Sequence, residues 1–152
     1  MNGHELAQIN VARMRDSLDS ATMRGFLDVV DPMVRLAEQV DGFIWRLATE
    51  GHAVATHGDL VVNVSVWRSY ESLHDFVYRS HHGGLVRRRS EWFGPTPQPS
   101  TALWWVPPGH RPSVDEALRR LAVFERYGPS PRAFGLRHRF EPDGRRAVRT
   151  QI

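Results

Sequence analysis

Hydrophobic and polar side chains alternate along residues 4–15 and again along residues 60–67. A period of two is typical of a β-strand that buries one face. One face of each segment is apolar, and the opposite, mixed faces carry Leu6, Gln8, Asn10, Asn63, Ser65 and Trp67. The alternation therefore predicts two strands that present polar side chains on one face.

Apolar side chains recur at every third or fourth position between the cap candidates Asp19 and Ser20 and the terminating Gly42. This spacing predicts an amphipathic helix. Pro32 lies inside the apolar stripe. Because proline lacks a backbone N–H and its ring collides with the preceding turn, we expect a kink or a break there.

Two further helical segments follow later in the chain. Ser69 is placed to cap a helix that the glycines at 83–84 break or bend, and the helical pattern resumes over 85–93. A capping box, with Ser113 at the cap and a glutamate three residues later, opens a helix over 114–127.

Residues 43–49, 101–106 and 133–140 are short apolar segments that we expect to form strands. The segment 94–100 carries alternating prolines and is expected to be an extended connector. The first elements then follow the order strand, helix, strand, strand, helix, strand, which is the split β-α-β order of ferredoxin-like folds. The expected fold class is α+β: an antiparallel sheet with helices on one face, plus a C-terminal helix and strand.

One face of this sheet carries valines and tryptophans that helices on the other face leave uncovered. Pairing two such sheets across a two-fold axis buries both open faces, so the pattern predicts a homodimer. No repeat or second domain is visible. Residues 1–140 form the single expected domain, and residues 141–152 form an expected flexible tail.

The composition agrees with one globular domain. The chain has 152 residues, of which 41% are hydrophobic and 24% are charged, and both values are ordinary for such domains. It contains no cysteine, which excludes disulfides, thiolate metal sites and cysteine nucleophiles. We see neither an apolar run of membrane-spanning length nor a secretory signal. We therefore expect a cytoplasmic protein without a membrane partner.

The 20 basic residues are all arginines, and 17 acidic residues leave a net charge of +3. The high isoelectric point follows from arginine, which keeps its charge to very high pH. A nucleic-acid site needs a basic face interleaved with aromatic side chains, but Glu91 closely follows the arginines at 87–89. We therefore expect no nucleic-acid partner.

The densest group of chemically active side chains lies within residues 67–92. On one continuous helix, His74, Tyr78 and either His81 or His82 share a face. Adjacent helical residues point about 100° apart, so only one of the two neighbouring histidines faces inward. Histidine is well suited to transfer protons near neutral pH. The alternative is that these are exposed histidines at a helix end that bind its carbonyl groups. No histidines stand at metal-ligand spacing, so we expect no metal site.

The chain also contains 5 tryptophans. They either fill the core and a dimer interface or form the walls of a pocket for a flat, hydrophobic ligand. Trp104 and Trp105 face opposite sides of their strand, so only one of them can join a pocket under the helices.

Several short motifs stand out along the chain. They are Ser65-Val66-Trp67, Phe76-Val77-Tyr78-Arg79-Ser80, His82, Arg87-Arg88-Arg89, Glu91-Trp92-Phe93, Ala102-Leu103-Trp104-Trp105-Val106-Pro107, Gly109-His110-Arg111-Pro112 and Gly128-Pro129-Ser130-Pro131-Arg132-Ala133-Phe134. Together, from about His4 to Phe140, they resemble the bacterial family called domain of unknown function 3291. That resemblance implies a place among the dimeric α/β-barrel proteins. These include antibiotic-biosynthesis monooxygenases, haem-degrading oxygenases, chlorite-dismutase-like haem proteins and cofactor-free cyclases.

The resemblance also implies candidate site residues. In cofactor-free monooxygenase relatives, polar groups and sheet aromatics hold a polyketide-like substrate whose enolate reacts with oxygen. We expect His82 to act as general base or acid, with Arg88 or Arg79 stabilising an enolate or carboxylate. The expected substrate-binding residues are Gln8, Asn10, Asn63, Trp67, Tyr78, Trp92, Trp105 and His110.

Three functions are compatible with the sequence. The favoured one is a cofactor-independent enzyme that is either monooxygenase-like or an isomerase/cyclase. Its substrate would be hydrophobic or aromatic, and secondary metabolites are one such class. The second is a haem-binding protein, in which His82 or His81 would be the axial ligand and arginines would pair with the propionates. The third is a non-catalytic module that binds a small ligand.

Overall fold

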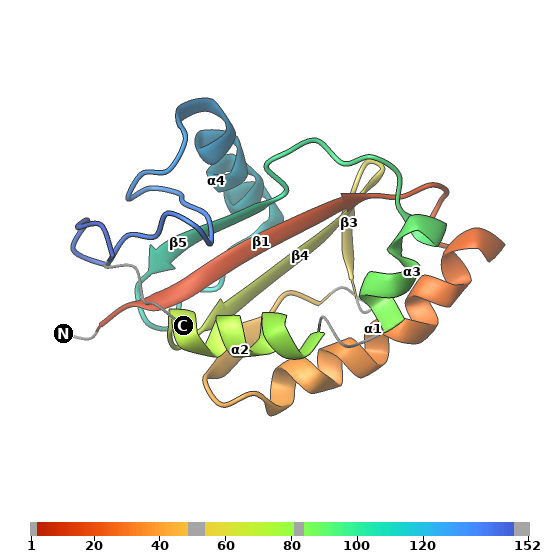
Figure 1. The fold of residues 1–152 in the computed structure, drawn as a ribbon, viewed down its shortest axis with the longest axis horizontal. Helices are drawn as coiled ribbons and strands as arrows, with labels where there is room; N and C mark the ends of the chain where they lie inside the picture. Colours follow the sequence, from red (N-terminus) through yellow and green to blue (C-terminus); the bar gives the residue numbers. More distant parts are fainter. Residues whose placement is uncertain (1–2, 49–53, 81–83, 148–152) are drawn as a thin grey trace.

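The computed structural model describes residues 3–48, 54–80 and 84–147 of the chain. In this part, strands form one antiparallel sheet and helices pack on both of its faces (Figure 1). The strands are β1 (Glu5–Arg13), β2 (Phe43–Arg46), β3 (Ala55–His57), β4 (Leu60–Trp67) and β5 (Thr101–Val106). The helices are α1 (Ala21–Gln39), α2 (Tyr70–Ser80), α3 (Gly84–Trp92) and α4 (Val114–Tyr127).

The first strand lies in the middle of the sheet. The strand order is β2-β4-β1-β5, and β1 pairs antiparallel with both β4 and β5. β2 pairs with the end of β4 and β3 with its beginning, so β2 and β3 form one interrupted edge strand. This order, with α1 after β1 and α2 after β4, confirms the predicted α+β fold with its split β-α-β arrangement.

Different helices cover the two faces of the sheet (Figure 1). α1, α2 and α3 cover the face that carries Leu6, Trp67 and Leu103. On the opposite face, Ala117 and Leu121 of α4 pack against alternate residues of β1, β4 and β5. These strand residues are Ala7, Ile9, Val11, Val62, Val64, Val66, Ala102, Trp104 and Val106. The helices of the split unit thus share one face, as expected, and the C-terminal helix buries the other.

α4 occupies the face that the sequence pattern left for a second copy of the chain. Val62, Val64 and Val66 of β4 are at most 1% exposed within a single chain. The partly exposed apolar residues of this face gather toward the β2 edge and include Ile44 and Trp45. Because α4 covers this face within one chain, an uncovered sheet face is no longer a reason to expect a homodimer. The homodimer stays a prediction.

α1 begins as predicted and continues through Pro32. Ser20 Oγ accepts a hydrogen bond from the Met23 backbone N–H at 3.2 Å, which caps the first turn. Pro32 is exposed, and the helix does not break there. Burial of apolar side chains such as Phe26 and Val30 offsets the hydrogen bond that the proline cannot donate. Within the described residues, no helix is both long and apolar enough to cross a membrane.

The strand expected over 133–140 is reduced to isolated bridges, one of which joins it to β5. Phe134 exchanges two backbone hydrogen bonds with Leu103 of β5, at 2.7 and 2.9 Å. Residues 136–138 are exposed instead of continuing along β5. Phe134 and Leu136 are spaced two apart as in a strand, but Leu136 is 40% exposed, so burial does not fix one face of this segment.

Side chains hold the segment after this bridge against the domain. Trp105 Nε1 donates to the Phe140 carbonyl at 2.7 Å, and the Arg139 guanidinium lies 3.6 Å from the ring centroid of Tyr70. Residues 141–147 turn back, and their last backbone N–H donates to the Arg139 carbonyl at 2.9 Å. The described C-terminal segment is therefore fastened to both β5 and α2.

Candidate functional site

A cavity of about 440 Å³ lies between the sheet and the helices α1–α3. Its walls are mainly apolar side chains from α1, from α2 and from the residue after α3. They are Phe26, Val30, Met33, Val34, Ala37, Leu73, Phe76, Val77 and Phe93. This volume falls in the range of small-molecule sites, about 300–1,000 Å³.

The floor of the cavity is a polar strip that crosses the sheet. In one row, Ser65 of β4 stands between Gln8 of β1 and Arg46 of β2. In the next row, Asn10 of β1 stands between Asn63 of β4 and Thr101 of β5, and Asn10 Nδ2 donates to Thr101 Oγ1 at 2.8 Å. Because paired residues of antiparallel strands point to the same face, all of these side chains face the helices. All of them line the cavity.

Ser65 organises the inner half of this floor. Its buried hydroxyl accepts hydrogen bonds from Gln8 Nε2 at 2.9 Å and from Trp67 Nε1 at 2.8 Å. The Trp67 indole is held between aromatic neighbours, with ring centroids 5.4 Å from Phe43 and 5.3 Å from Phe76. Two donors directed at one oxygen fix the orientation of both side chains.

Asn63 differs from its neighbours in the strip. Its side chain lines the cavity, and its amide makes no hydrogen bond with another described residue. An amide offers both a carbonyl acceptor and an N–H donor. Asn63 can therefore bind a polar group of a ligand without breaking a bond within the described part of the protein.

Arg46 and Arg89 bring positive charge to the cavity, and neither was among the predicted site residues. Burial lowers the pKa of the Arg46 guanidinium, and the carboxylates of Glu38 and Asp31 oppose this shift. Arginine still stays charged at neutral pH, because its ordinary pKa is far higher. Since the lining residues that the structure describes include no carboxylate, the cavity favours an anionic or strongly polar ligand group.

A β-bulge explains why Arg46 was missed. Simple alternation puts Arg46 on the same face as Ile44. The register between β2 and β4 shifts between Phe43 and Trp45, which puts Arg46 opposite Ser65. Helical spacing separates the three arginines at 87–89 onto different sides of α3. Arg89 could be chosen among them only if the side of α3 that faces the cavity were known.

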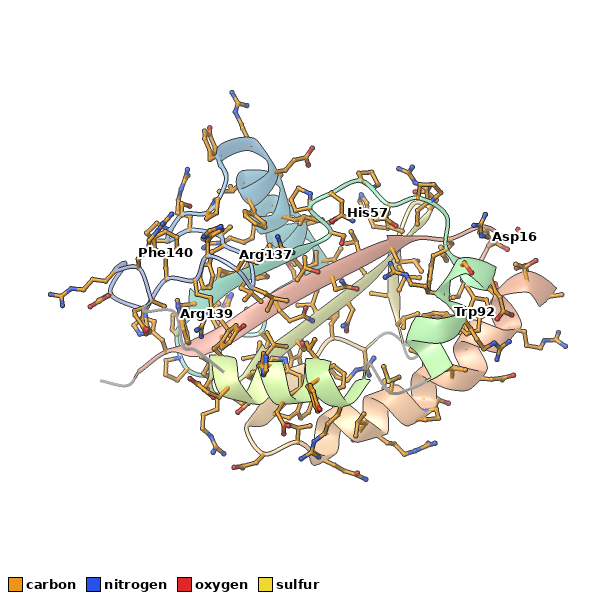
Figure 2. All side chains as sticks on the ribbon, viewed as in Figure 1. Asp16, His57, Trp92, Arg137, Arg139 and Phe140 are labelled. Atoms are coloured by element: carbon orange, nitrogen blue, oxygen red, sulfur yellow. The ribbon has the colours of Figure 1, made fainter. Side chains whose placement is uncertain are left out.

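The structure brings Gln8, Asn10, Asn63 and Trp67 together, and these are four of the predicted substrate-binding residues. Trp92 lies elsewhere, among α1 and α3 (Figure 2). It is 1% exposed, and its ring centroid is 5.9 Å from that of Phe26. In this position it stabilises the core and does not line the cavity.

Three other predicted side chains on α2 and α3 also point away from the cavity. Tyr78 is 63% exposed. Arg79 pairs with Asp75 at 3.3 Å, and Arg88 pairs with Glu91 at 2.8 Å. Neither arginine lines the cavity, whereas Arg46 and Arg89 do.

Trp105 and His110 are the remaining predicted substrate-binding residues among those that the structure describes. Trp105 binds the C-terminal segment through its indole N–H. His110 Nε2 lies 2.7 Å from Glu116 Oε1, and Trp104 Nε1 donates to the other oxygen of this carboxylate at 3.3 Å. Glu116 and Trp104 belong to the α4 side of the sheet, so His110 lies outside the cavity.

His81 and His82, the predicted acid–base or haem-binding residues, lie outside the described residues. Within the described part, no three histidine or carboxylate side chains gather where they could hold a metal ion. The described cavity lining offers amides, hydroxyls and guanidinium groups. These groups can bind and polarise a carbonyl or an enolate.

The sheet order, the helices on both faces and the polar floor define a ferredoxin-like α+β domain with a cavity of small-molecule size. The chain belongs to the family described as Domain of unknown function (DUF3291), whose model matches residues 5–150. This match confirms the family resemblance found in the sequence. No curated protein sequence matches the chain.

The structure is similar to several solved structures of low sequence identity. The Mycobacterium tuberculosis protein Rv0793 is 16% identical, with 72% of this chain and 99% of that chain covered and a TM-score of 0.49. The cofactor-independent oxygenase SnoaB from Streptomyces nogalater is 10% identical, with 74% and 98% covered and a TM-score of 0.46. A candidate antibiotic biosynthesis monooxygenase from Chloroflexus aurantiacus is 14% identical, with 72% and 98% covered and a TM-score of 0.42.

Proposed function

We propose that this protein is a small-molecule enzyme that forms and uses the enolate of a hydrophobic or aromatic substrate, without a bound cofactor. The observation that carries the proposal is the polar strip beneath an apolar roof. The strip ends at Arg46 on one side and Thr101 on the other, and Arg89 adds a second cation. An aromatic body fits the roof, while its carbonyl group meets the strip.

The strip supports enolate formation by electrostatics. A hydrogen-bond donor or cation next to a carbonyl oxygen stabilises the negative charge that develops when a neighbouring C–H loses its proton. Asn63 can supply the donor, and Arg46 and Arg89 can supply the positive charge.

A general base must remove the proton. The described lining residues contain no carboxylate or imidazole. His82 stays the predicted base from the sequence, and its replacement tests that prediction directly. If the enolate then reacts with oxygen, the protein is a monooxygenase, and if the enolate is protonated or attacks within the substrate, it is an isomerase or a cyclase.

Anthrone is a suitable probe, because it is flat and carries acidic C–H bonds next to a conjugated carbonyl system. Its oxidation consumes one O₂ and yields anthraquinone and one H₂O, so absorbance and an oxygen electrode can follow the reaction. Arg46→Gln and Arg89→Gln should each lower kcat at least about ten-fold. The matched control is Arg35→Gln, an exposed arginine of α1 that does not line the cavity. If Arg46→Gln and Arg89→Gln keep the same kcat as Arg35→Gln, the proposed site is wrong.

Two alternatives give different results in simple assays. A non-catalytic binding module would bind aromatic probes in the cavity but would not accelerate loss of anthrone. A haem protein would develop a saturable Soret band on titration with haem, and His82→Ala or His81→Ala would abolish it. A His82→Ala variant that keeps its fold and loses only anthrone turnover would support the proposed enzyme.

A further inference from the structure

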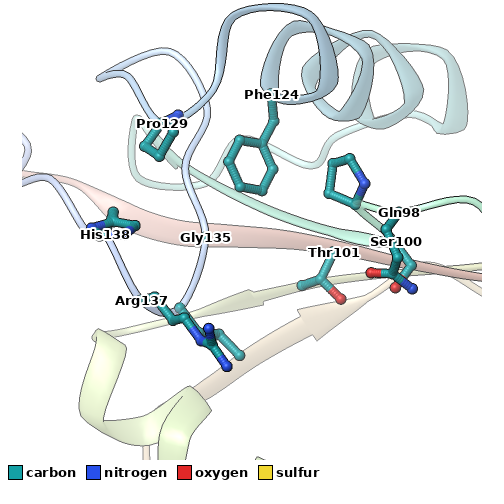
Figure 3. Close-up of a pocket in the computed structure, with 10 residues that line it drawn as sticks. Gln98, Ser100, Thr101, Phe124, Pro129, Gly135, Arg137 and His138 are labelled. Carbon is teal, nitrogen blue, oxygen red and sulfur yellow. The ribbon is translucent and has the colours of Figure 1, made fainter.

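A second cavity, of about 270 Å³, lies beside the first at the β5 edge of the sheet (Figure 3). It is bounded by the end of α4, the proline-containing segment before β5 and the C-terminal segment after the Phe134 bridge. Gly135 brings the C-terminal segment close to α4, because a Cβ at this position would lie only 3.0 Å from the Phe124 ring. Most of the surface that lines this cavity is apolar, and Phe124 and Pro129 contribute to it.

The two cavities meet at the edge of β5. Ser100, Thr101 and Leu136 line both of them. Thr101 is also the last residue of the polar strip, where its hydroxyl accepts the hydrogen bond from Asn10. A ligand whose body fills the inner cavity can therefore reach the outer one past this threonine.

The outer cavity contains basic side chains that form no hydrogen bond or ion pair with other described residues. Arg137 and His138 line it, and the lining residues that the structure describes include no carboxylate. Neither side chain makes a hydrogen bond or an ion pair with another residue that the structure describes. Arginines nearby in the sequence are engaged: Arg139 stacks on Tyr70, and Arg145 lies 3.5 Å from a carboxylate.

We propose that the outer cavity binds an anionic group on the substrate, so that the protein acts on amphipathic molecules with an apolar or aromatic body and an acidic group on a short arm. The inference rests on the proposed function, because it extends the same site. The Arg137 guanidinium provides N–H donors for a carboxylate, and His138 adds a further donor. Ser100 and Thr101 line the passage for the arm.

A pair of fluorescent probes tests the inference. 1-Pyrenebutyrate and 1-pyrenebutanol share the aromatic body and the arm, and only the first carries a charge. Energy transfer from the tryptophans, including Trp67 in the inner cavity, reports binding of both. We expect the wild-type protein to bind the carboxylate more tightly, and increasing salt should weaken that preference.

Arg137→Gln should weaken pyrenebutyrate binding about five-fold, as expected for loss of a partly exposed charge contact, and should leave pyrenebutanol binding unchanged. Arg137→Lys should restore part of the preference. Arg145→Gln is the matched control, because it removes the same charge from the same segment at an 86% exposed side chain outside both cavities.

The possible failures can be told apart. If both probes bind equally and Arg137→Gln changes neither affinity, the outer site is wrong while the inner cavity still binds its ligand. If Arg89→Gln abolishes the preference and Arg137→Gln does not, the inner cavity recognises the anion, and the outer site is again wrong. If neither probe binds, the inference and the proposed substrate cavity fail together.

Discussion

Ser65→Ala is the substitution whose effect on the free energy of unfolding follows most directly from the structure. The Ser65 hydroxyl is the acceptor for both Gln8 Nε2 and Trp67 Nε1, and Ser65 is only 5% exposed. Alanine keeps the strand and adds no bulk, so the change removes one oxygen and leaves two donors without their acceptor. A buried donor without a partner loses its hydration and gains nothing in exchange.

The two donors are affected differently. Trp67 is 0% exposed and is held between two aromatic rings, so its indole N–H cannot readily turn toward another acceptor. Gln8 lines the cavity, where its amide can turn toward water. With about 1–3 kcal/mol for each unpaired buried donor, and partial recovery for Gln8, we expect a loss of about 2–3 kcal/mol. For a domain of this size, that lowers Tm by roughly 5–10 °C.

Urea denaturation followed by tryptophan fluorescence measures this loss, and a double-mutant cycle identifies its cause. Trp67→Phe removes the indole donor, so Ser65→Ala should cost about 1–2 kcal/mol less in that background. Ser65→Thr, which keeps the hydroxyl on a residue that strands favour, should remain near wild-type stability. A loss below about 0.5 kcal/mol for Ser65→Ala, which is ordinary for a surface position, would refute the reasoning, and so would an absence of coupling.

Gly42→Ala should destabilise the protein more than Gly109→Ala, by about 1–3 kcal/mol in urea denaturation. Both glycines have positive φ, 96° and 83°, but only at Gly42 would a Cβ overlap the Ser72 side chain, so equal losses would contradict the expected clash. Arg88→Gln should leave anthrone turnover unchanged, and a large loss of turnover would restore Arg88 to the site. Its effect on Tm should be small and dependent on pH, because the hydrogen bond from Arg88 lowers the pKa of Glu91. A lowered carboxyl pKa stabilises the fold above the ordinary value, and this contribution is lost as pH falls through the lowered one. The Tm difference between wild type and variant should therefore shrink in acid to the contribution of the Arg88 contact with the Trp92 ring, 4.8 Å from its centroid, and a difference that does not change with pH would contradict the ion pair.

The parts of the fold that depend on local chemistry could be predicted from the sequence. β4 and β5 begin and end at the predicted residues, and Ser20 and Ser113 cap their helices through their hydroxyls. The polar floor could also be predicted, because a period of two assigns Gln8 and Asn63 to one side of their strands whatever surrounds them.

The parts that depend on long-range packing could not be predicted. Nothing local to α4 indicates which face of the sheet it covers, although this decides whether the valines of β4 need a partner chain. The inclusion of Arg46 in the site depends on a register shift between two strands, which a hydrophobic pattern does not show. Arg88 and Arg89 are adjacent in the sequence, and only the packing of α3 decides that Arg89 lines the cavity.

The edges of the sheet affect how the protein behaves in crowded solution. A long, exposed strand edge offers consecutive unpaired backbone groups, on which another chain can add a strand and start a fibril. One edge here is divided between β2, with 4 residues, and β3, with 3 residues. At the other edge, Phe134 already satisfies the backbone of Leu103. Among the described residues, neither edge presents a long continuous template, so the fold should resist aggregation by strand addition even at high concentration.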